Sequence, residues 1–167
     1  GRFYLAICNG AVILRYPEKT IVSESYLSLH ETELVRKILQ EKEHPCIING
    51  TIHSNERTFT FHNPPTRPPI LNFLANQKKE HFVFDTILQS NESQFSCLYS
   101  AVPSSMIEKE IIEFNKEYPH LNFTYIADPS SDGYHWLGLM PPNTGKEYLL
   151  KYFKQKYNAQ NHEILAA

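Results

Sequence analysis

The sequence predicts an α+β fold, in which an antiparallel sheet with helices fills the middle of the chain and α/β segments lie at both ends. Two observations favour this class. Short β-prone runs separated by turn residues dominate the first half, and strand, helix, strand, turn and strand patterns follow one another between residues 94 and 140. The 167 residues, 41% hydrophobic and 20% charged, have the composition of a globular protein rather than a disordered one.

The beginning of the chain predicts a small β-meander. An apolar run at residues 3–8 has the length of a strand, and Asn9-Gly10 separates it from a second β-prone run at 11–16. Asn-Gly between two such runs is a strong signal for a hairpin turn. A further turn at residues 17–19 leads to a short run at 20–22, which completes the meander.

Three Ser/Thr-x-x-Glu patterns, at residues 28–31, 105–108 and 144–147, predict where helices begin. In such a capping box, the hydroxyl and the carboxylate each bind a backbone N–H group that otherwise lacks a partner. Apolar stripes follow at helical spacing: Leu34, Val35, Ile38 and Leu39 in the first helix, Ile107, Ile111, Phe114 and Tyr118 in the second, and Leu149, Leu150, Phe153 and Tyr157 in the third. Pro119 is predicted to end the second helix.

The remaining segments predict more strands and one irregular loop. Residues 46–52 and 58–62 predict a second hairpin. The proline-rich segment 63–69 predicts an irregular surface loop, because proline lacks a backbone N–H group and has a fixed φ. Residues 70–88 carry a weak pattern that allows a short helix, followed by a second helix or a strand. Strands are also predicted at residues 94–102, 121–127, 134–140 and 162–167.

The charge balance excludes some classes of partner. The formal net charge is −2, with 16 Lys and Arg against 18 Asp and Glu, so no excess of positive charge is available for a nucleic-acid backbone or an anionic membrane. The sequence contains no apolar run of membrane-spanning length and no signal peptide pattern. We therefore expect no nucleic acid and no membrane as partner, while the oligomeric state stays open.

Cys8, Cys46 and Cys97 are predicted to be buried thiols in a reducing compartment. They are odd in number, far apart and without a CxxC pair, so they fit neither a disulfide framework nor a zinc site. Asn-x-Ser/Thr sequons at residues 49, 91 and 122 would suit a secreted chain, but so short a pattern arises readily by chance. The absence of a signal peptide favours a cytoplasmic location.

Lys146 is the strongest candidate for chemistry. It lies in the first turn of a predicted helix, where unpaired N–H groups and the positive end of the dipole favour an anion. A cation there opposes the dipole by about 0.3–1 kcal/mol, so either a substrate phosphate or nearby carboxylates would explain it. The alternative is an exposed lysine whose small penalty is tolerated. A P-loop is excluded, since Glu147 follows the lysine and Met140 stands where the first glycine should be.

Three segments resemble motifs of a known family. The run at 137–150, followed by a helix and the apolar run at 162–167, resembles the approach to the third and fourth motifs of haloacid dehalogenase phosphatases with a large α/β cap, such as Cof-like and sucrose-phosphate phosphatase-like members. Cys8-Asn9-Gly10-Ala11 resembles the Asn-Gly-Ala element that leads from a core strand into the cap. Gly1-Arg2 resembles the end of the (Ser/Thr)-Gly-Arg motif, but the family has a helix and a loop between these two elements, and only six residues intervene here.

The resemblance implies an α+β cap domain, an antiparallel sheet with helices, inserted in a partial Rossmann-like α/β core. Residues 1–14 and 137–167 would belong to the core, and residues 15–136 would form the cap.

The resemblance also implies hydrolysis of a phosphomonoester, such as a sugar phosphate, through an aspartyl-phosphate, with Mg²⁺ and a lysine holding the phosphate charge. Lys146 matches that lysine. The only aspartates are Asp85, Asp128 and Asp132, without an Asp-x-Asp pair, so the nucleophile and the Mg²⁺ ligands are expected outside this chain. The chain alone is then expected to be inactive. A non-catalytic binding module and a degenerate family member remain alternatives.

The other candidates are substrate-binding residues. Asn9 and Gly10 belong to the Asn-Gly-Ala element, and Arg67, His135 and Trp136 offer donors and an aromatic face to a sugar. A solvated arginine and half-buried strand aromatics are the alternative for these last three. No metal site is predicted for His53, His62 and His81, whose spacing is irregular, and no nucleophile for Ser104 and Ser105, which lack a Gly-x-Ser-x-Gly elbow.

Overall fold

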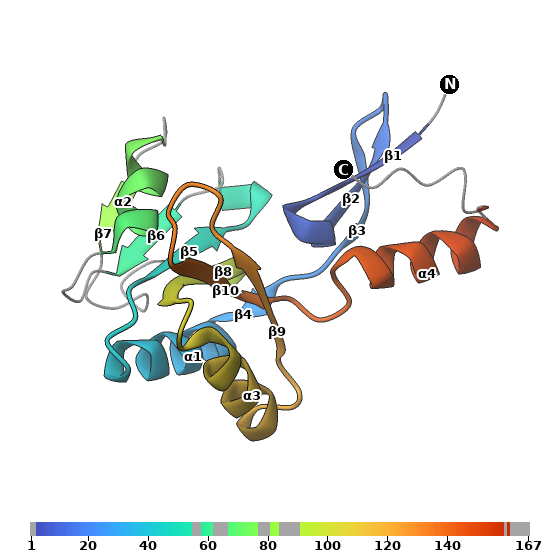
Figure 1. Cartoon of the computed structure of the whole chain (residues 1–167). Helices are drawn as coiled ribbons and strands as arrows, with labels where there is room; N and C mark the ends of the chain where they lie inside the picture. The colour runs from blue at the N-terminus through green and yellow to red at the C-terminus, as the bar shows by residue number, and fades with distance from the viewer. Residues whose placement is uncertain are drawn as a thin grey trace. The chain divides into compact units, whose positions relative to one another are not determined.

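The computed structural model of the chain describes residues 3–54, 58–61, 67–76, 81–83, 91–158 and 160 (Figure 1). The chain divides into two compact units. Unit 1 comprises Gly1–Ser25 and Pro141–Ala167, and unit 2 is the intervening Tyr26–Met140. The family resemblance implies earlier divisions, after residues 14 and 136.

Unit 1 contains the meander that the sequence predicts. Its antiparallel sheet has the order β1-β2-β3, with β1 (Phe3–Ile7), β2 (Val12–Tyr16) and β3 (Thr20–Glu24). The 3-10 turn η1 (Cys8–Gly10) joins the first two strands. Asn9 has φ 53° and ψ 29°, and Gly10 has φ 88°, which are the left-handed angles of a type I′ hairpin turn. The Ala11 N–H group closes this turn on the Cys8 carbonyl at 3.0 Å.

The helix α4 (Lys146–Tyr157) packs against the sheet of unit 1. The Tyr4 ring of β1 stacks on Tyr157 at a centroid distance of 4.4 Å and lies 5.7 Å from Phe153. At the other end of the helix, Leu149 lies against Gly10, where an added Cβ would come within 2.8 Å of its Cδ1 atom. Leu149, Phe153 and Tyr157 of the predicted stripe therefore face β1 and the Asn9-Gly10 turn, whereas Leu150 is exposed.

Unit 2 is built on a seven-stranded sheet with the order β7-β6-β5-β8-β10-β9, and with β4 beside β8. The strands are β4 (Leu27–Ser28), β5 (Cys46–Gly50), β6 (Thr58–Phe61), β7 (His81–Val83), β8 (Gln94–Pro103), β9 (Asn122–Ala127) and β10 (Tyr134–Met140). All described pairs are antiparallel except β6 with β7, which are parallel. A mixed α/β unit with an antiparallel sheet is therefore confirmed, with this one parallel pair as an addition.

Helices cover both faces of this sheet (Figure 1). The helices α1 (Leu29–Glu41) and α3 (Ile107–Glu117) pack on the sheet and form the main core with it. The buried residues of this core are Leu27, Val35, Leu39, Cys46, Ile48, Phe95, Leu98, Val102, Ile107, Phe114, Leu121, Phe123, Leu137 and Leu139. The helix α2 (Pro68–Ala75) brings Ile70 to a smaller cluster with Ile47 and Ala101. Adjacent residues such as Ile47 and Ile48 serve opposite faces, as strand geometry requires.

One of the three predicted capping boxes is confirmed. The Glu31 N–H group donates to Ser28 Oγ at 3.2 Å, and the Ser28 N–H group donates to the Glu31 carboxylate at 2.8 Å. The box at Ser105 is wrong, because β8 continues to Pro103 and a turn closed by Met106 N–H on the Pro103 carbonyl delays α3 until Ile107.

The box at Thr144 is also wrong. The Thr144 hydroxyl donates to the Pro141 carbonyl at 2.7 Å, and the N-cap of α4 is Gly145, which has no side chain to cap the helix. The helix therefore begins one residue later than the pattern predicts. Lys146 becomes the first residue of α4.

The proline-rich segment corrects a second expectation. Pro68 and Pro69 occupy the first turn of α2, which tolerates proline because its N–H groups need no helical acceptor. The short helix expected after residue 70 is thus confirmed with an earlier start, and β7 confirms the strand alternative. Parts of three predicted segments lie outside the described residues: 63–66 of the loop, 84–88 of the weak pattern, and the final strand at 162–167. His62 lies outside them as well.

The cysteines differ in their environment. Cys46 and Cys97 are buried, as expected, and Cys8 in the turn η1 is only half-buried. Burial raises the pKa of the Cys46 thiol to about 12. Cys46 is therefore an apolar core residue, which matches an inert thiol rather than a reactive one.

Candidate functional site

The Asn9-Gly10 turn and the start of α4 form one corner of unit 1. The Gly145 N–H group donates to the Asn9 carbonyl at 2.9 Å, so the residue before Lys146 is bonded directly to the turn. Gly145 has φ 91° and Gly10 has φ 88°, a region that residues with a Cβ rarely adopt. Two glycines therefore allow the helix start and the hairpin turn to meet at this corner.

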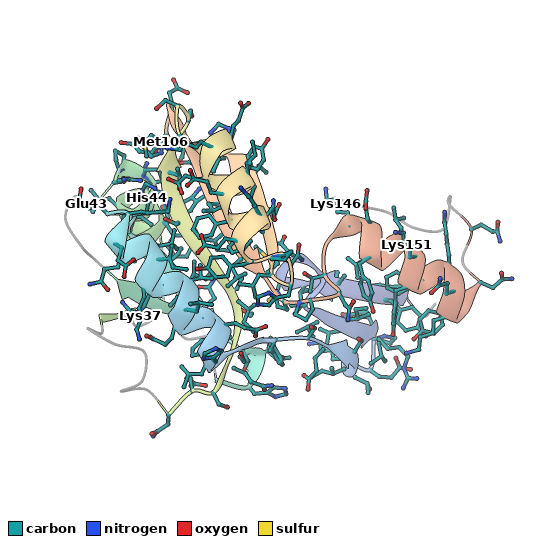
Figure 2. All side chains as sticks on the ribbon, turned by 90° about the horizontal axis from the view of Figure 1, so that it is seen from below. Lys37, Glu43, His44, Met106, Lys146 and Lys151 are labelled. Atoms are coloured by element: carbon teal, nitrogen blue, oxygen red, sulfur yellow. The ribbon has the colours of Figure 1, made fainter. Side chains whose placement is uncertain are left out.

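Lys146 is exposed at this corner (Figure 2). It forms no hydrogen bond or ion pair with the part of the chain that the structure describes, and the acidic residue of the same helical turn is Glu147. Among the described residues, no carboxylate is therefore paired with Lys146, although such pairing is one of the two compensations that the sequence allows. An external anion and a tolerated penalty remain as explanations of the cation at this position.

The corner offers two kinds of donor to an anion. The N–H groups of the first helical turn have no acceptor within the helix, because the first helical bond of α4 runs from Leu149 N–H to the Gly145 carbonyl at 3.1 Å. The Lys146 ammonium group adds a full positive charge beside them. Together, such N–H groups and a lysine are the usual donors for the oxygens of a phosphate group.

Arg67 is largely occupied by contacts within unit 2. Its Nη1 group donates to the Ala101 carbonyl, and its Nη2 group donates to the Glu43 carbonyl at 3.1 Å. Burial lowers the pKa of Arg67. The guanidinium group thus joins the start of α2 to β8 and to the residues after α1, which leaves only part of its donor set for a ligand.

His135 and Trp136 lie on opposite faces of β10, since adjacent strand residues alternate. His135 Nδ1 is 2.9 Å from the Ser104 hydroxyl, and its ring lies 5.9 Å from Tyr125. Trp136 packs in the α2 cluster, with its ring 6.3 Å from Phe73 and 6.2 Å from that of Tyr99. The structure therefore does not bring these two candidates into one site.

A buried charged cluster is not predicted by the sequence. His44 and Glu110 are 2% and 3% exposed, and their Nε2 and Oε1 atoms are 3.5 Å apart. Lys42 Nζ lies 2.8 Å from Glu110 Oε2 and 3.1 Å from Glu113 Oε2. The sequence signal that could have predicted the burial of Glu110 is its position within the apolar helical stripe of Ile107, Ile111 and Phe114.

The pKa shifts in this cluster have identifiable causes. Burial lowers the pKa of His44, and the positive charge of Arg67 lowers it further, against the attraction of Glu110. Although burial opposes it, hydrogen bonding to Glu110 and Glu113 raises the pKa of Lys42. The cluster therefore combines a lysine that stays charged with a histidine that resists protonation.

The described residues do not offer a metal site. Among them, no group of three or more His, Cys, Asp or Glu side chains is placed to hold an ion. The Asp128 carboxylate accepts bonds from the backbone and the hydroxyl of Ser130 at 3.1 and 3.0 Å, which suits a turn rather than a ligand. None of the described helices is long and apolar enough to cross a membrane.

Nearly the whole chain matches one family. The model of the haloacid dehalogenase-like hydrolases matches residues 2–167, and the chain belongs to this family. Comparison with curated proteins finds no match.

Solved structures show the same fold. A haloacid dehalogenase-like hydrolase from Bacteroides thetaiotaomicron is 13% identical, with a TM-score of 0.66 over 93% of this chain and 54% of its own. SMU.1108c from Streptococcus mutans UA159 is 14% identical, with a TM-score of 0.65 over 90% and 52%. BT4131, described as a subclass IIB sugar phosphatase, is 12% identical, with a TM-score of 0.62 over 93% and 53%. The chain thus spans about half the length of these structures.

Proposed function

We propose that this chain forms the cap and part of the core of a phosphatase that hydrolyses a phosphomonoester of the sugar phosphate class. The family supports a hydrolase, and the sugar phosphatase among the similar structures supports the substrate class. The observation that carries the proposal is the 2.9 Å hydrogen bond from Gly145 to Asn9, because it fixes the start of α4 at the Asn-Gly-Ala element. Lys146 is then the residue that meets the phosphate.

In this proposal, unit 2 is the cap and unit 1 belongs to the core. The cap closes over the reacting phosphate, excludes water and selects the leaving group. The divisions after Ser25 and Met140 would then mark where the chain leaves and re-enters the core. Arg67, limited by its two backbone contacts, and one of His135 and Trp136, which lie on opposite faces of β10, stay candidates for contacts to the leaving group.

The chemical role of Lys146 is electrostatic. Phosphoryl transfer places negative charge on the equatorial oxygens, so a fixed ammonium group stabilises the transition state. The N–H groups at the start of α4 orient the same oxygens. The aspartate nucleophile, the acid/base and the ligands of the Mg²⁺ expected for this family are proposed to lie outside this sequence, which contains no Asp-x-Asp.

The test is Lys146→Ala in a complete protein that carries the remaining motifs. We expect kcat to fall by about 10²–10³, the size of the effect when one preorganised donor to a developing charge is removed. Lys151→Ala is the matched control, because Lys151 is an exposed lysine on the same helix (Figure 2) and should leave kcat unchanged. Equal rates for Lys146→Ala and Lys151→Ala would contradict the assigned role.

A further inference from the structure

The strand β9 is an edge strand of the unit 2 sheet. Among the described strands it pairs only with β10. The Asp128 N–H group donates to the Tyr134 carbonyl at 3.1 Å, so Asp128 directs its backbone groups toward β10. Along an antiparallel pair, every second residue directs its backbone N–H and C=O groups toward the neighbouring strand, and the residues between direct theirs away from it. The backbone groups of Phe123, Tyr125 and Ala127 therefore point away from β10, and none of them has a hydrogen-bond partner within the described ranges.

This edge lacks the features that normally prevent strand pairing. Natural edges carry lysines, prolines or bulges that block a second strand. The sequence of β9 is Asn-Phe-Thr-Tyr-Ile-Ala, without charge or proline, and its register with β10 has no bulge. Tyr125 is 46% exposed and Ile126 is 67% exposed. The edge is therefore open to an extended partner with uncharged side chains.

We infer that β9 pairs with β9 of a second copy of this chain, antiparallel and centred on Tyr125. A twofold axis perpendicular to the sheet keeps each side chain on its own face, so a residue can lie opposite its own copy. Centred on Tyr125, all three outward residues form hydrogen-bonded pairs, Tyr125 with Tyr125 and Phe123 with Ala127 on each side. Centred on Thr124, the strand would leave Ala127 without an opposite residue inside β9.

The side chains are self-complementary in this register. The Tyr125 rings lie side by side, and an aromatic cross-strand pair is favourable. On the other face, Ile126 lies opposite Thr124 of the second copy, and no like charges meet along the strand. An interface of one strand per copy is small, so the dimer forms reversibly and depends on concentration.

Cysteine substitution tests the register. In a Cys8→Ser background, where the remaining thiols are buried, Tyr125→Cys should give a disulfide-linked dimer on oxidation. The Cα atoms of a hydrogen-bonded pair are about 5.5 Å apart, within the range that a disulfide spans. Thr124→Cys is the matched control, because it lies opposite Ile126 and should stay monomeric. Equal cross-linking at both positions, or none at either, would overturn the inference.

A charge on the edge tests the dimer without cross-linking. Ile126→Lys should abolish the concentration-dependent dimer in sedimentation of the 167-residue chain. Ile112→Lys is the matched control, since Ile112 is equally exposed at 66% but lies on α3, and the dimer should persist. Melting curves verify that both variants fold. A wild-type chain that is monomeric at every concentration, or equal loss in both variants, would refute the pairing, and neither result bears on phosphatase activity.

Discussion

Replacing Gly10 with alanine tests how the candidate site is built. Gly10 has φ 88°, and a Cβ added there would lie 2.8 Å from Leu149 Cδ1, 3.0 Å from Cγ and 3.2 Å from Cδ2. All three are side-chain atoms of the helix that carries Lys146, so the whole leucine side chain has to move. The substitution therefore perturbs the contact between the hairpin turn and α4.

The loss in the free energy of unfolding expected for Gly10→Ala has two parts. A left-handed φ costs a residue with a Cβ roughly 1–2 kcal/mol, and forcing extra volume into a packed site costs about 1–3 kcal/mol. Gly145→Ala is the matched control, because Gly145 has φ 91° but nothing within 4 Å of an added Cβ. It should carry only the first part, about 1–2 kcal/mol.

Local hydrogen exchange in unit 1 is a suitable assay. The Ala11 and Leu149 amides are hydrogen-bonded in the turn and in the first turn of α4, so their exchange reports on both sides of the contact. Gly10→Ala should accelerate exchange more than Gly145→Ala does, and adding Leu149→Ala to Gly10→Ala should remove the excess. Equal acceleration in the two glycine variants would refute the packing of Leu149 on Gly10.

Three further predictions follow from the described residues. The pKa of His44 is lowered in the folded chain, so as the pH falls the unfolded chain binds a proton at this histidine first. The contribution of His44 to the free energy of unfolding should be fully present above pH 6.5 and should fall by up to about 1.4 kcal/mol per pH unit below it. Denaturant melts measure this slope, and His44→Leu should remove it. Arg67→Met should cost about 1–3 kcal/mol by leaving two carbonyl contacts unmade, whereas unchanged melts would show that they are not stabilising. The chain alone should not hydrolyse a generic phosphate ester with Mg²⁺, and appreciable Mg²⁺-dependent turnover would contradict the expected absence of the nucleophile.

Local signals explain which elements the sequence predicts well. Asn9-Gly10 forms the expected turn because both residues accept the left-handed angles that the turn requires. Ser28 caps α1 because the helix begins directly after it, so its hydroxyl oxygen accepts from the Glu31 N–H group. The same pattern at Thr144 fails because α4 begins one residue later, with Gly145 as its N-cap, and the one at Ser105 fails because β8 extends to Pro103 and α3 begins only at Ile107. A capping box therefore predicts a nearby helix start but not the residue at which it begins.

Such local signals do not predict contacts between segments that are far apart in the sequence. No spacing in the sequence predicts that Arg67 donates to carbonyls of residues 43 and 101, or that His44 meets Glu110. The bond between Gly145 and Asn9 joins residues 136 positions apart, and only the family resemblance suggested that these two segments belong to one site.

The central claim is that Lys146 meets a phosphoryl anion. The most direct measurement is the affinity of the complete protein for inorganic phosphate, by titration calorimetry, for the wild type, Lys146→Ala and Lys151→Ala. We expect about tenfold weaker binding for Lys146→Ala, which corresponds to a loss of about 1.4 kcal/mol, and no change for Lys151→Ala. Equal affinity in all three proteins would contradict the claim.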